Sequence, residues 1–279
     1  MRAAIDIGSN SVRLLTTGGI KRSTITKLAD GIESTGVLSP VGLERTIAVL
    51  TEYAALAGAD CEIIAFATEA VRRAKDGEAF ISRVKKEVGL DIRLLSPEDE
   101  ARLALSGAKK DDGAVTVCDL GGGSLEVISA ADGVTPEYIK SLPLGVVVLK
   151  NKFAGDFSKL TDDAPNLVAP YGKIEKYPVV FMGGSATNIA AGMMNLPYYD
   201  PNKVNGYKIT LKELDGFLPI LLSKNLPTLR PVCAKRADTL AYGAIMIIAL
   251  LNHIGVTEFT VSDSSNLEAA LSGALTPSK

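Results

Sequence analysis

Three short glycine turns are the features of this sequence with the clearest capacity for chemistry. Each one follows an apolar run that predicts a buried strand. Glycine lets a backbone approach a ligand closely, and successive N–H groups in such a turn can bind an anion. One glycine turn is an ordinary structural feature, but three at strand ends indicate phosphate binding. The residues expected to contact phosphate are Ser9, Asn10, Gly121, Gly122, Gly123, Ser124, Gly183, Gly184 and Ser185.

Carboxylates stand beside two of these turns. Asp6 and Asp119 each end a predicted strand directly before the glycine, and Glu126 follows Asp119 on the return strand. Carboxylates next to a phosphate site are the usual ligands of Mg²⁺. An aspartate in this position also serves simply to accept turn N–H groups, so the residues alone leave both interpretations open. The GxxxxGK[ST] motif is absent, which excludes a P-loop nucleotidase.

Two further charged groups could act on a bound phosphate. Arg72 follows a predicted strand, and an arginine can grip phosphate with two parallel hydrogen bonds. Glu100 lies in the first turn of a helix opened by Ser96-Pro97, where the helix dipole alone favours an acidic residue. From the residues by themselves, a helix-dipole role for Glu100 and a solvated surface role for Arg72 are the better accounts.

Composition excludes several classes of protein. The single histidine, His253, excludes zinc sites built on several histidines. The three cysteines are far apart and form no CxxC pair, which fits a reducing compartment. A net charge of −2 argues against a nucleic-acid binder, and the longest apolar run is too short to cross a bilayer. We therefore expect a cytoplasmic protein without nucleic-acid or membrane partners.

Strands alternate with helices along the chain, which is typical of the α/β class. Predicted strands cover residues 3–7, 12–15, 62–67, 91–95, 115–119, 125–129, 178–182 and 257–261. Predicted helices begin at Pro40, Pro97 and just after Thr210, and cover 77–88, 186–194, 235–252 and 266–275. Cys118 is expected in the core.

The second half of the chain begins as the first half does. Residues 5–11 and 118–124 each give an apolar strand, an aspartate and a glycine turn. An internal repeat of this kind predicts two similar lobes around a cleft. The polar segment 109–113 is the expected boundary, which gives lobes of residues 1–113 and 114–279. In an alternative arrangement, the final helix packs on the first lobe.

Eight ordered blocks of the sequence resemble the exopolyphosphatase/guanosine pentaphosphate phosphohydrolase (Ppx/GppA) family. In chain order they are AAIDIGSNSVRLL (3–15), GVLSPVGLERT (36–46), ATEAVRRAKDGEAF (67–80), SPEDEARLALSG (96–107), CDLGGGSLEV (118–127), SLPLGVVVL (141–149), FMGGSATNIAA (181–191) and KRADTLAYGA (235–244). The resemblance implies two ribonuclease-H-like (actin-like ATPase) lobes with a central cleft, as in the actin–Hsp70–sugar kinase superfamily.

The resemblance also implies a role for each charged residue. Glu100 corresponds to the family's catalytic carboxylate and Arg72 to an arginine that faces the phosphates. Asp119 and Glu126, with Asp6, correspond to the site of Mg²⁺ or another divalent cation. The chain departs from the family pattern at residues 27–29 and 264–269, in segments that bear on substrate binding.

The function that the resemblance implies is metal-dependent hydrolysis of the terminal phosphoanhydride of inorganic polyphosphate, with release of orthophosphate. Guanosine pentaphosphate is the alternative substrate, and Tyr198, Tyr199 and Tyr207 are candidates to stack on its base. A polyphosphate:nucleotide phosphotransferase and a non-catalytic phosphate or nucleotide sensor are further alternatives. A homodimer is left open.

Overall fold

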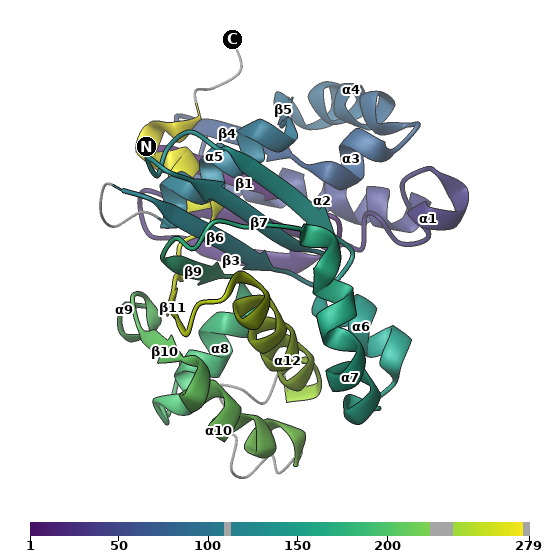
Figure 1. Cartoon of the computed structure of the whole chain (residues 1–279). Helices are drawn as coiled ribbons and strands as arrows, with labels where there is room; N and C mark the ends of the chain where they lie inside the picture. The colour runs from purple at the N-terminus through teal and green to yellow at the C-terminus, as the bar shows by residue number, and fades with distance from the viewer. Residues whose placement is uncertain (109–112, 224–236, 276–279) are drawn as a thin grey trace. The chain divides into compact units, whose positions relative to one another are not determined.

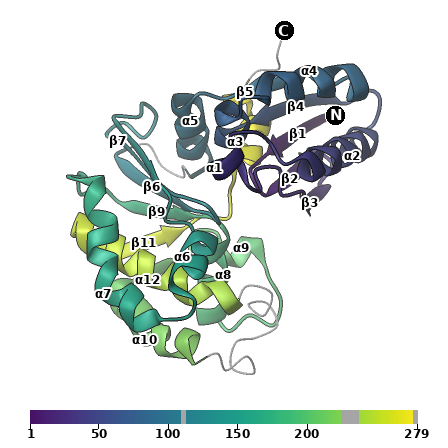
Figure 2. The ribbon, with the colours of Figure 1, turned by 90° about the vertical axis from the view of Figure 1, so that its right-hand side faces the viewer.

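The computed structural model describes residues 1–108, 113–223 and 237–275, which form two α/β units (Figures 1 and 2). Unit 1 comprises Met1–Gly107 and Ser265–Lys279, and unit 2 comprises Ala108–Ser264. The expected boundary at 109–112 lies outside the described residues, as do Lys235 and Arg236 of the expected helix 235–252. Each unit is described separately below.

Unit 1 is built on a five-stranded sheet in the order β3-β2-β1-β4-β5. The strands are β1 (Arg2–Ile7), β2 (Ser11–Thr16), β3 (Lys21–Ile25), β4 (Glu62–Ala67) and β5 (Ile92–Leu94). β2 runs antiparallel to both β1 and β3, whereas β1, β4 and β5 are parallel. Four of these strands are as predicted. β3 escapes prediction because its charged sequence, KRSTI, lies largely exposed at the sheet edge.

Helices cover both faces of this sheet. They are α1 (Ile32–Thr35), α2 (Pro40–Ala57), α3 (Glu69–Arg73), α4 (Gly77–Val88), α5 (Pro97–Ala108) and α13 (Asn266–Ala269). Ala3, Ile5 and Ile7 of β1 face the core shared with α2 and α4, and Ala4 faces the core shared with α5 and α13. Burial on both faces explains why β1 is an unbroken apolar run rather than an alternating one.

The last described segment of the chain packs in unit 1 and is helical over most of its length, as expected. α13 ends at Ala269, and one turn of π-helix, Ala270–Ala274, continues it, with a kink at Gly273, where φ is 102°. The predicted helix over 266–275 is therefore confirmed up to this kink. Ser265 and Glu268 form a capping box, so the departure from the family pattern at 264–269 makes a helix start.

Unit 2 repeats the plan of unit 1 with one strand added. Its strands are β6 (Val115–Leu120), β7 (Leu125–Ala130), β8 (Tyr138–Leu142), β9 (Val179–Met182), β10 (Lys208–Thr210) and β11 (Glu258–Val261). The order β8-β7-β6-β9-β11 matches β3-β2-β1-β4-β5 strand for strand, with the same directions. The expected fold class, α/β with two ribonuclease-H-like lobes, is confirmed.

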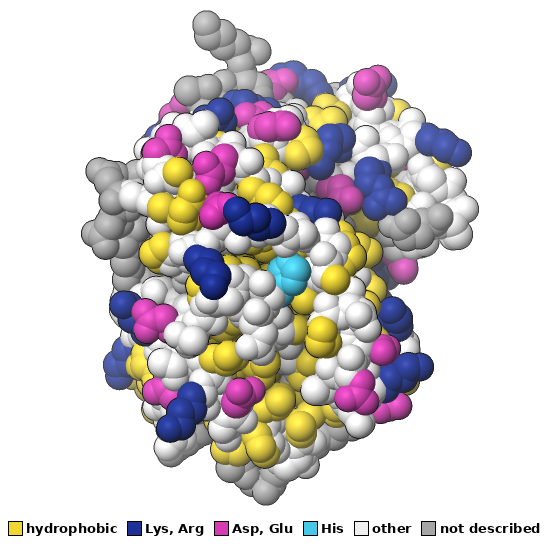
Figure 3. Space-filling view, in the orientation of Figure 1, with side chains coloured by type: hydrophobic (Ala, Val, Ile, Leu, Met, Phe, Trp, Pro, Cys, Tyr) yellow, Lys and Arg dark blue, Asp and Glu magenta, His cyan; other side chains and the backbone are white. Residues whose placement is uncertain are grey.

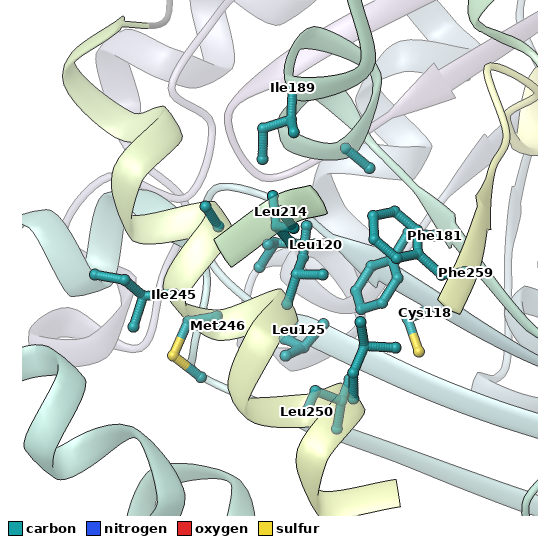
Figure 4. Packing of buried hydrophobic residues seen from close by; sticks show 14 of the residues in the cluster. Cys118, Leu120, Leu125, Phe181, Ile189, Leu214, Ile245, Met246, Leu250 and Phe259 are labelled. Atoms are coloured by element: carbon teal, nitrogen blue, oxygen red, sulfur yellow. The ribbon is translucent and has the colours of Figure 1, made fainter. Parts of the chain in front are cut away.

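The helices of unit 2 share one large apolar core with its sheet (Figure 4). They are α6 (Val146–Phe153), α7 (Phe157–Val168), α8 (Gly184–Met193), α9 (Pro201–Val204), α10 (Leu211–Leu222) and α12 (Ala237–Ile254), with a 3₁₀ turn at Ala169–Tyr171. Cys118 lies fully buried in this core, as expected. α8 begins two residues earlier than predicted, so Gly184 and Ser185 belong to its first turn.

The surface shows no segregation of charge on the face drawn in Figure 3, where basic and acidic side chains are interspersed. This pattern agrees with the near balance of 30 basic and 32 acidic residues in the sequence. Among the helices that the structure describes, none is both long enough and apolar enough to cross a membrane.

Candidate functional site

The β6–β7 hairpin of unit 2 carries two of the expected metal ligands at its glycine turn. The turn is closed by a hydrogen bond of 3.0 Å from the Gly121 amide to the Ser124 carbonyl. Asp119 and Glu126 are direct partners across the two strands. Directly opposed residues of an antiparallel pair project from the same face of the sheet. The two carboxylates are therefore neighbours, and both are partly exposed.

The start of α6 holds the glycine turn from one side. The amides of Val146 and Val147 donate to the carbonyls of Gly121 and Gly122 at 3.0 and 2.9 Å, and Gly145 donates to Gly123 at 3.2 Å. The first amides of a helix lack partners within it, and here the turn supplies them. A Cβ at Gly145 would lie 2.3 Å from the Gly122 carbonyl carbon, so only glycine permits this approach.

These contacts decide where the remaining amides of the turn point. In a trans peptide the carbonyl and the following N–H point in opposite directions, and the described chain holds no cis peptide. With the carbonyls of residues 121–123 aimed at α6, the amides of Gly122, Gly123 and Ser124 point away from it. Gly122 and Gly123 are exposed, and their amides reach no backbone acceptor in the described residues. The turn thus presents a row of donors suited to an anion.

The third glycine turn lies against Asp119. Gly183 caps the ten-residue helix α8 with a φ of 90°, and a Cβ there would come within 2.8 Å of the Asp119 Oδ1 atom. A helix N-terminus in this position adds partial positive charge. Ser185, however, is buried against α12, where a Cβ on Gly243 would be 3.1 Å from its Oγ atom. Its side chain is therefore buried, which favours backbone groups of this turn as the donors to a ligand.

The glycine turn of unit 1 has the same construction. The Gly8 amide donates to the Ser11 carbonyl at 3.1 Å, which matches the bond between Gly121 and Ser124. Segment 26–29 has the role here that α6 has in unit 2. The Thr26 and Lys27 amides donate to the Asn10 carbonyl at 3.0 Å, and the Ala29 amide donates to the Ser9 carbonyl at 2.9 Å. The segment that departs from the family pattern at 27–29 therefore orients this turn, with Ser9 and Asn10 exposed.

Asp6 does not occupy the same chemical setting as Asp119. Arg13 lies directly opposite Asp6, at the position that Glu126 holds in unit 2. The Arg13 Nε donates to Asp6 Oδ2 at 3.1 Å, and its Nη2 donates to the same oxygen. Asp6 is also 3% exposed. A divalent cation at Asp6 would have to displace this guanidinium, so the structure assigns Asp6 to an ion pair.

Glu100 and Arg72 form the second charged group of unit 1. The Arg72 Nη1 donates to Glu100 Oε1 and to the Leu95 carbonyl, both at 2.5 Å. The Glu100 side chain is 15% exposed. Burial is the largest influence on the pKa of Glu100 and raises it. Arg72 lowers this pKa through its hydrogen bond and its charge, whereas the charges of Asp6 and Glu69 raise it. The net effect is a raised pKa. A carboxyl with a raised pKa is suited to accept a proton near neutral pH.

Asp119 and Glu126 fit a magnesium site in which the protein supplies few ligands. In the part of the chain that is described, no group of three or more His, Cys, Asp or Glu side chains could hold a metal. Mg²⁺ is commonly bound by one or two carboxylates, with waters and substrate phosphates completing its shell. Two neighbouring carboxylates beside a row of anion-binding amides match that pattern.

The sequence assigned no role to Arg13 or Gly145, and it marked residues 27–29 only as a departure from the family pattern that bears on substrate binding. For Arg13 the signal is in the sequence, because Asp6 and Arg13 are seven residues apart, as are Asp119 and Glu126. The contacts of Gly145 carry no comparable local signal, since they join segments more than twenty residues apart.

The three tyrosines suggested for base stacking do not share one environment. Tyr198 is 67% exposed. The Tyr199 hydroxyl is hydrogen-bonded to Asp263, and Tyr207 is partly buried against the core of unit 2. Only Tyr198 therefore offers most of its ring to solvent.

Comparison with known proteins gives consistent results. The model of the Ppx/GppA phosphatase family matches residues 15–275. Exopolyphosphatase 1 of Mycobacterium tuberculosis is 35% identical over 177 residues, which cover 58% of this chain and 49% of that protein. The chain thus spans about half the length of the curated relatives that it matches in this way. Exopolyphosphatase 2 of the same organism is 26% identical over 320 residues, covering 95% of this chain and 96% of that protein.

A solved structure extends the likeness to the fold. The crystal structure of the Aquifex aeolicus member of the Ppx/GppA family superposes with a TM-score of 0.82 at 31% identity, covering 97% of this chain and 95% of that one. The match of the family model over nearly the whole chain and the shared fold lead to one conclusion: the chain belongs to the Ppx/GppA phosphatase family.

Proposed function

We propose that this protein hydrolyses the terminal phosphoanhydride of inorganic polyphosphate and releases orthophosphate. The observation that carries the proposal is the glycine turn 121–124. The carbonyls of residues 121–123 accept hydrogen bonds from the start of α6, and the amides of residues 122–124 face away from that helix. Such a row of amides suits phosphate oxygens, and the neighbouring carboxylates Asp119 and Glu126 suit the metal that accompanies them. The similar proteins named as exopolyphosphatases support the choice of substrate.

Unit 1 supplies the base in this proposal. The Glu100 carboxylate accepts a proton from the attacking water, and the protonated carboxyl then releases that proton to solvent. The shielded setting and raised pKa of the carboxyl suit this task, because a weakly basic carboxylate would take a proton from water less readily. Arg72 belongs to the same group as the direct partner of Glu100.

Unit 2 supplies the phosphate cradle and the metal ligands. The amides of Gly122, Gly123 and Ser124 donate to the oxygens of the terminal phosphate, and the amides of Gly184 and Ser185 at the start of α8 add further donors. Asp119 and Glu126 would hold Mg²⁺, which when bound neutralises the charge that develops on the phosphate oxygens. Ser9 and Asn10 of the unit 1 turn are proposed to contact phosphate as well.

Guanosine pentaphosphate is the second candidate substrate. The observation in its favour is the exposed ring of Tyr198, which could stack on a guanine base. Phosphate release from polyphosphate and from guanosine pentaphosphate, each with Mg²⁺ or with EDTA, separates the two. Formation of ATP from ADP and polyphosphate would instead favour a phosphotransferase, and activity with neither substrate would favour a sensor.

Glu100→Gln tests the mechanism. We expect phosphate release to fall by about 10²–10⁴-fold, the usual contribution of general acid–base catalysis, with the circular dichroism spectrum unchanged. Glu98→Gln is the matched control, because Glu98 lies in the same helical turn and is exposed. Wild-type turnover in Glu100→Gln would overturn the proposed mechanism.

A further inference from the structure

We propose that Arg72 is a positioning residue, which fixes the Glu100 carboxylate for proton transfer. This inference rests on the proposed function of Glu100 as the base. It differs from the role that the family resemblance implies for Arg72, which is a direct contact with phosphate.

The hydrogen bonds of Arg72 are the first reason. A guanidinium Nη carries two N–H groups. Both N–H groups of Nη1 are engaged, since this atom donates to Glu100 Oε1 and to the Leu95 carbonyl at 2.5 Å each. The end-on fork that grips phosphate uses an N–H group from each Nη atom, so Arg72 would have to release Glu100 or the Leu95 carbonyl to form it. The bonds seen in the structure therefore direct this side of the guanidinium to Glu100 and not to a phosphate.

The backbone around Arg72 is the second reason. The Leu95 amide donates to the Ala67 carbonyl at 3.0 Å, which ties the ends of the parallel strands β4 and β5 together. Arg72 stands on α3 directly after β4, and its amide donates to the Thr68 carbonyl at 3.2 Å. Its side chain therefore links a rigid sheet edge to a carboxylate on α5. A link of this kind holds the carboxylate in one orientation, which proton transfer requires.

The charges around Glu100 are the third reason. Glu100 is faced by Glu69 and Arg72 from α3 and by Asp6 from β1. Two of these three neighbours are carboxylates, and Arg72 is the cation bonded to Glu100 itself. Without Arg72, burial and the remaining carboxylates would favour the protonated form, which cannot act as a base.

The test is the pH dependence of kcat and KM for polyphosphate in Arg72→Met and Arg72→Lys. We expect Arg72→Met to shift the acidic limb of the kcat profile to higher pH. At pH values below the limb, kcat should fall about tenfold for each pH unit of this shift, and KM should change by less than about threefold. Arg72→Lys should restore the position of the limb but not the full kcat, because one ammonium replaces a planar fork.

Arg83→Met is the matched control. Arg83 lies on α4, and its ion pairs with Glu44 and Glu87 are solvent-exposed and do not involve a group that acts on Glu100, so neither the limb nor KM should move. An Arg72→Met profile with the limb in place and KM raised tenfold or more would overturn the inference in favour of a phosphate clamp. This outcome is distinct from failure of the proposed function, which would appear as wild-type turnover in Glu100→Gln.

Discussion

Glu100 is both the proposed base and a residue whose ionisation opposes folding. Burial is the main reason that its pKa is raised, and only Arg72 among the groups acting on it pulls the pKa down. A carboxyl with a pKa that is higher in the folded than in the unfolded chain binds protons more tightly when folded. Ionised Glu100 therefore reduces the free energy of unfolding at neutral pH, which is the usual conflict between activity and stability.

At the residue scale, we predict that Glu100→Gln gains stability relative to wild type as pH rises. The wild-type penalty is absent well below the ordinary glutamate pKa, develops through that value, and is complete above the raised folded pKa. Glutamine stays neutral, so it escapes this penalty. Urea unfolding of both proteins at pH 4 and pH 7.5 measures the difference in unfolding free energy. The idea fails if the variant loses stability relative to wild type between these pH values.

At the element scale, each of the two hairpin turns, 8–11 and 121–124, depends on a neighbouring segment whose amides bond to its carbonyls. In unit 2 this segment is the start of α6, and in unit 1 it is residues 26–29. Helix starts usually take their acceptors from side-chain caps, but Gly145 gives α6 no side-chain cap. The turn and the helix therefore satisfy each other, so that a change in one must disturb the other.

Two glycine substitutions separate the packing of this turn from its binding function. Gly145→Ala forces a Cβ to within 2.3 Å of the Gly122 backbone, and we expect it to lower stability by about 1–3 kcal/mol and to abolish activity. At Gly123 a Cβ meets nothing within 4 Å, so Gly123→Ala should keep wild-type stability. It should nevertheless raise KM for polyphosphate, because the added methyl group stands where a phosphate must approach. Unfolding by urea and phosphate release measure both effects; an unchanged kcat/KM in Gly123→Ala would argue against phosphate at this turn.

At the scale of the whole molecule, the two units share a plan but carry different chemistry. The same hairpin ends in an Asp–Arg pair in unit 1 and in an Asp–Glu pair in unit 2. The proposed function uses this difference, with the base in unit 1 and the metal ligands in unit 2. A ligand that binds the folded chain in preference to the unfolded chain raises its stability, so thermal unfolding reports whether substrate binds.

We predict that polyphosphate with Mg²⁺ raises the melting temperature of Glu100→Gln, a variant that cannot consume the ligand. The unfolding free energy should rise by about 2.7 kcal/mol at a ligand concentration of 100 times Kd. Adding Asp119→Asn should remove the part of the shift that requires Mg²⁺. Asp162→Asn, a change of an exposed aspartate on α7, should leave the shift intact. A Mg²⁺-dependent shift that survives Asp119→Asn would place the metal elsewhere.

The elements that the sequence predicts well carry their own local signals. Ser39 caps α2, Gly89 ends α4 in a left-handed conformation, and Thr210 and Glu213 form the capping box of α10. α7 is missed because its sequence is polar and contains Pro165, and it is held by packing against α12 rather than by its own propensity. The glycine turns are also local, so the sequence alone placed all three at strand ends.

The sequence by itself determined the fold class, the repeated hairpins and the residue types at the site, because strand period, caps and turns depend on neighbours along the chain. Only the tertiary structure decided what those residues touch. Arg72 and Glu100 are 28 residues apart, and the Asp6 carboxylate could be assigned to Arg13 only once β1 and β2 were in register. The direction of the glycine amides was likewise fixed by α6, a helix more than twenty residues away, because a peptide carbonyl that bonds one partner turns the next N–H toward the opposite side.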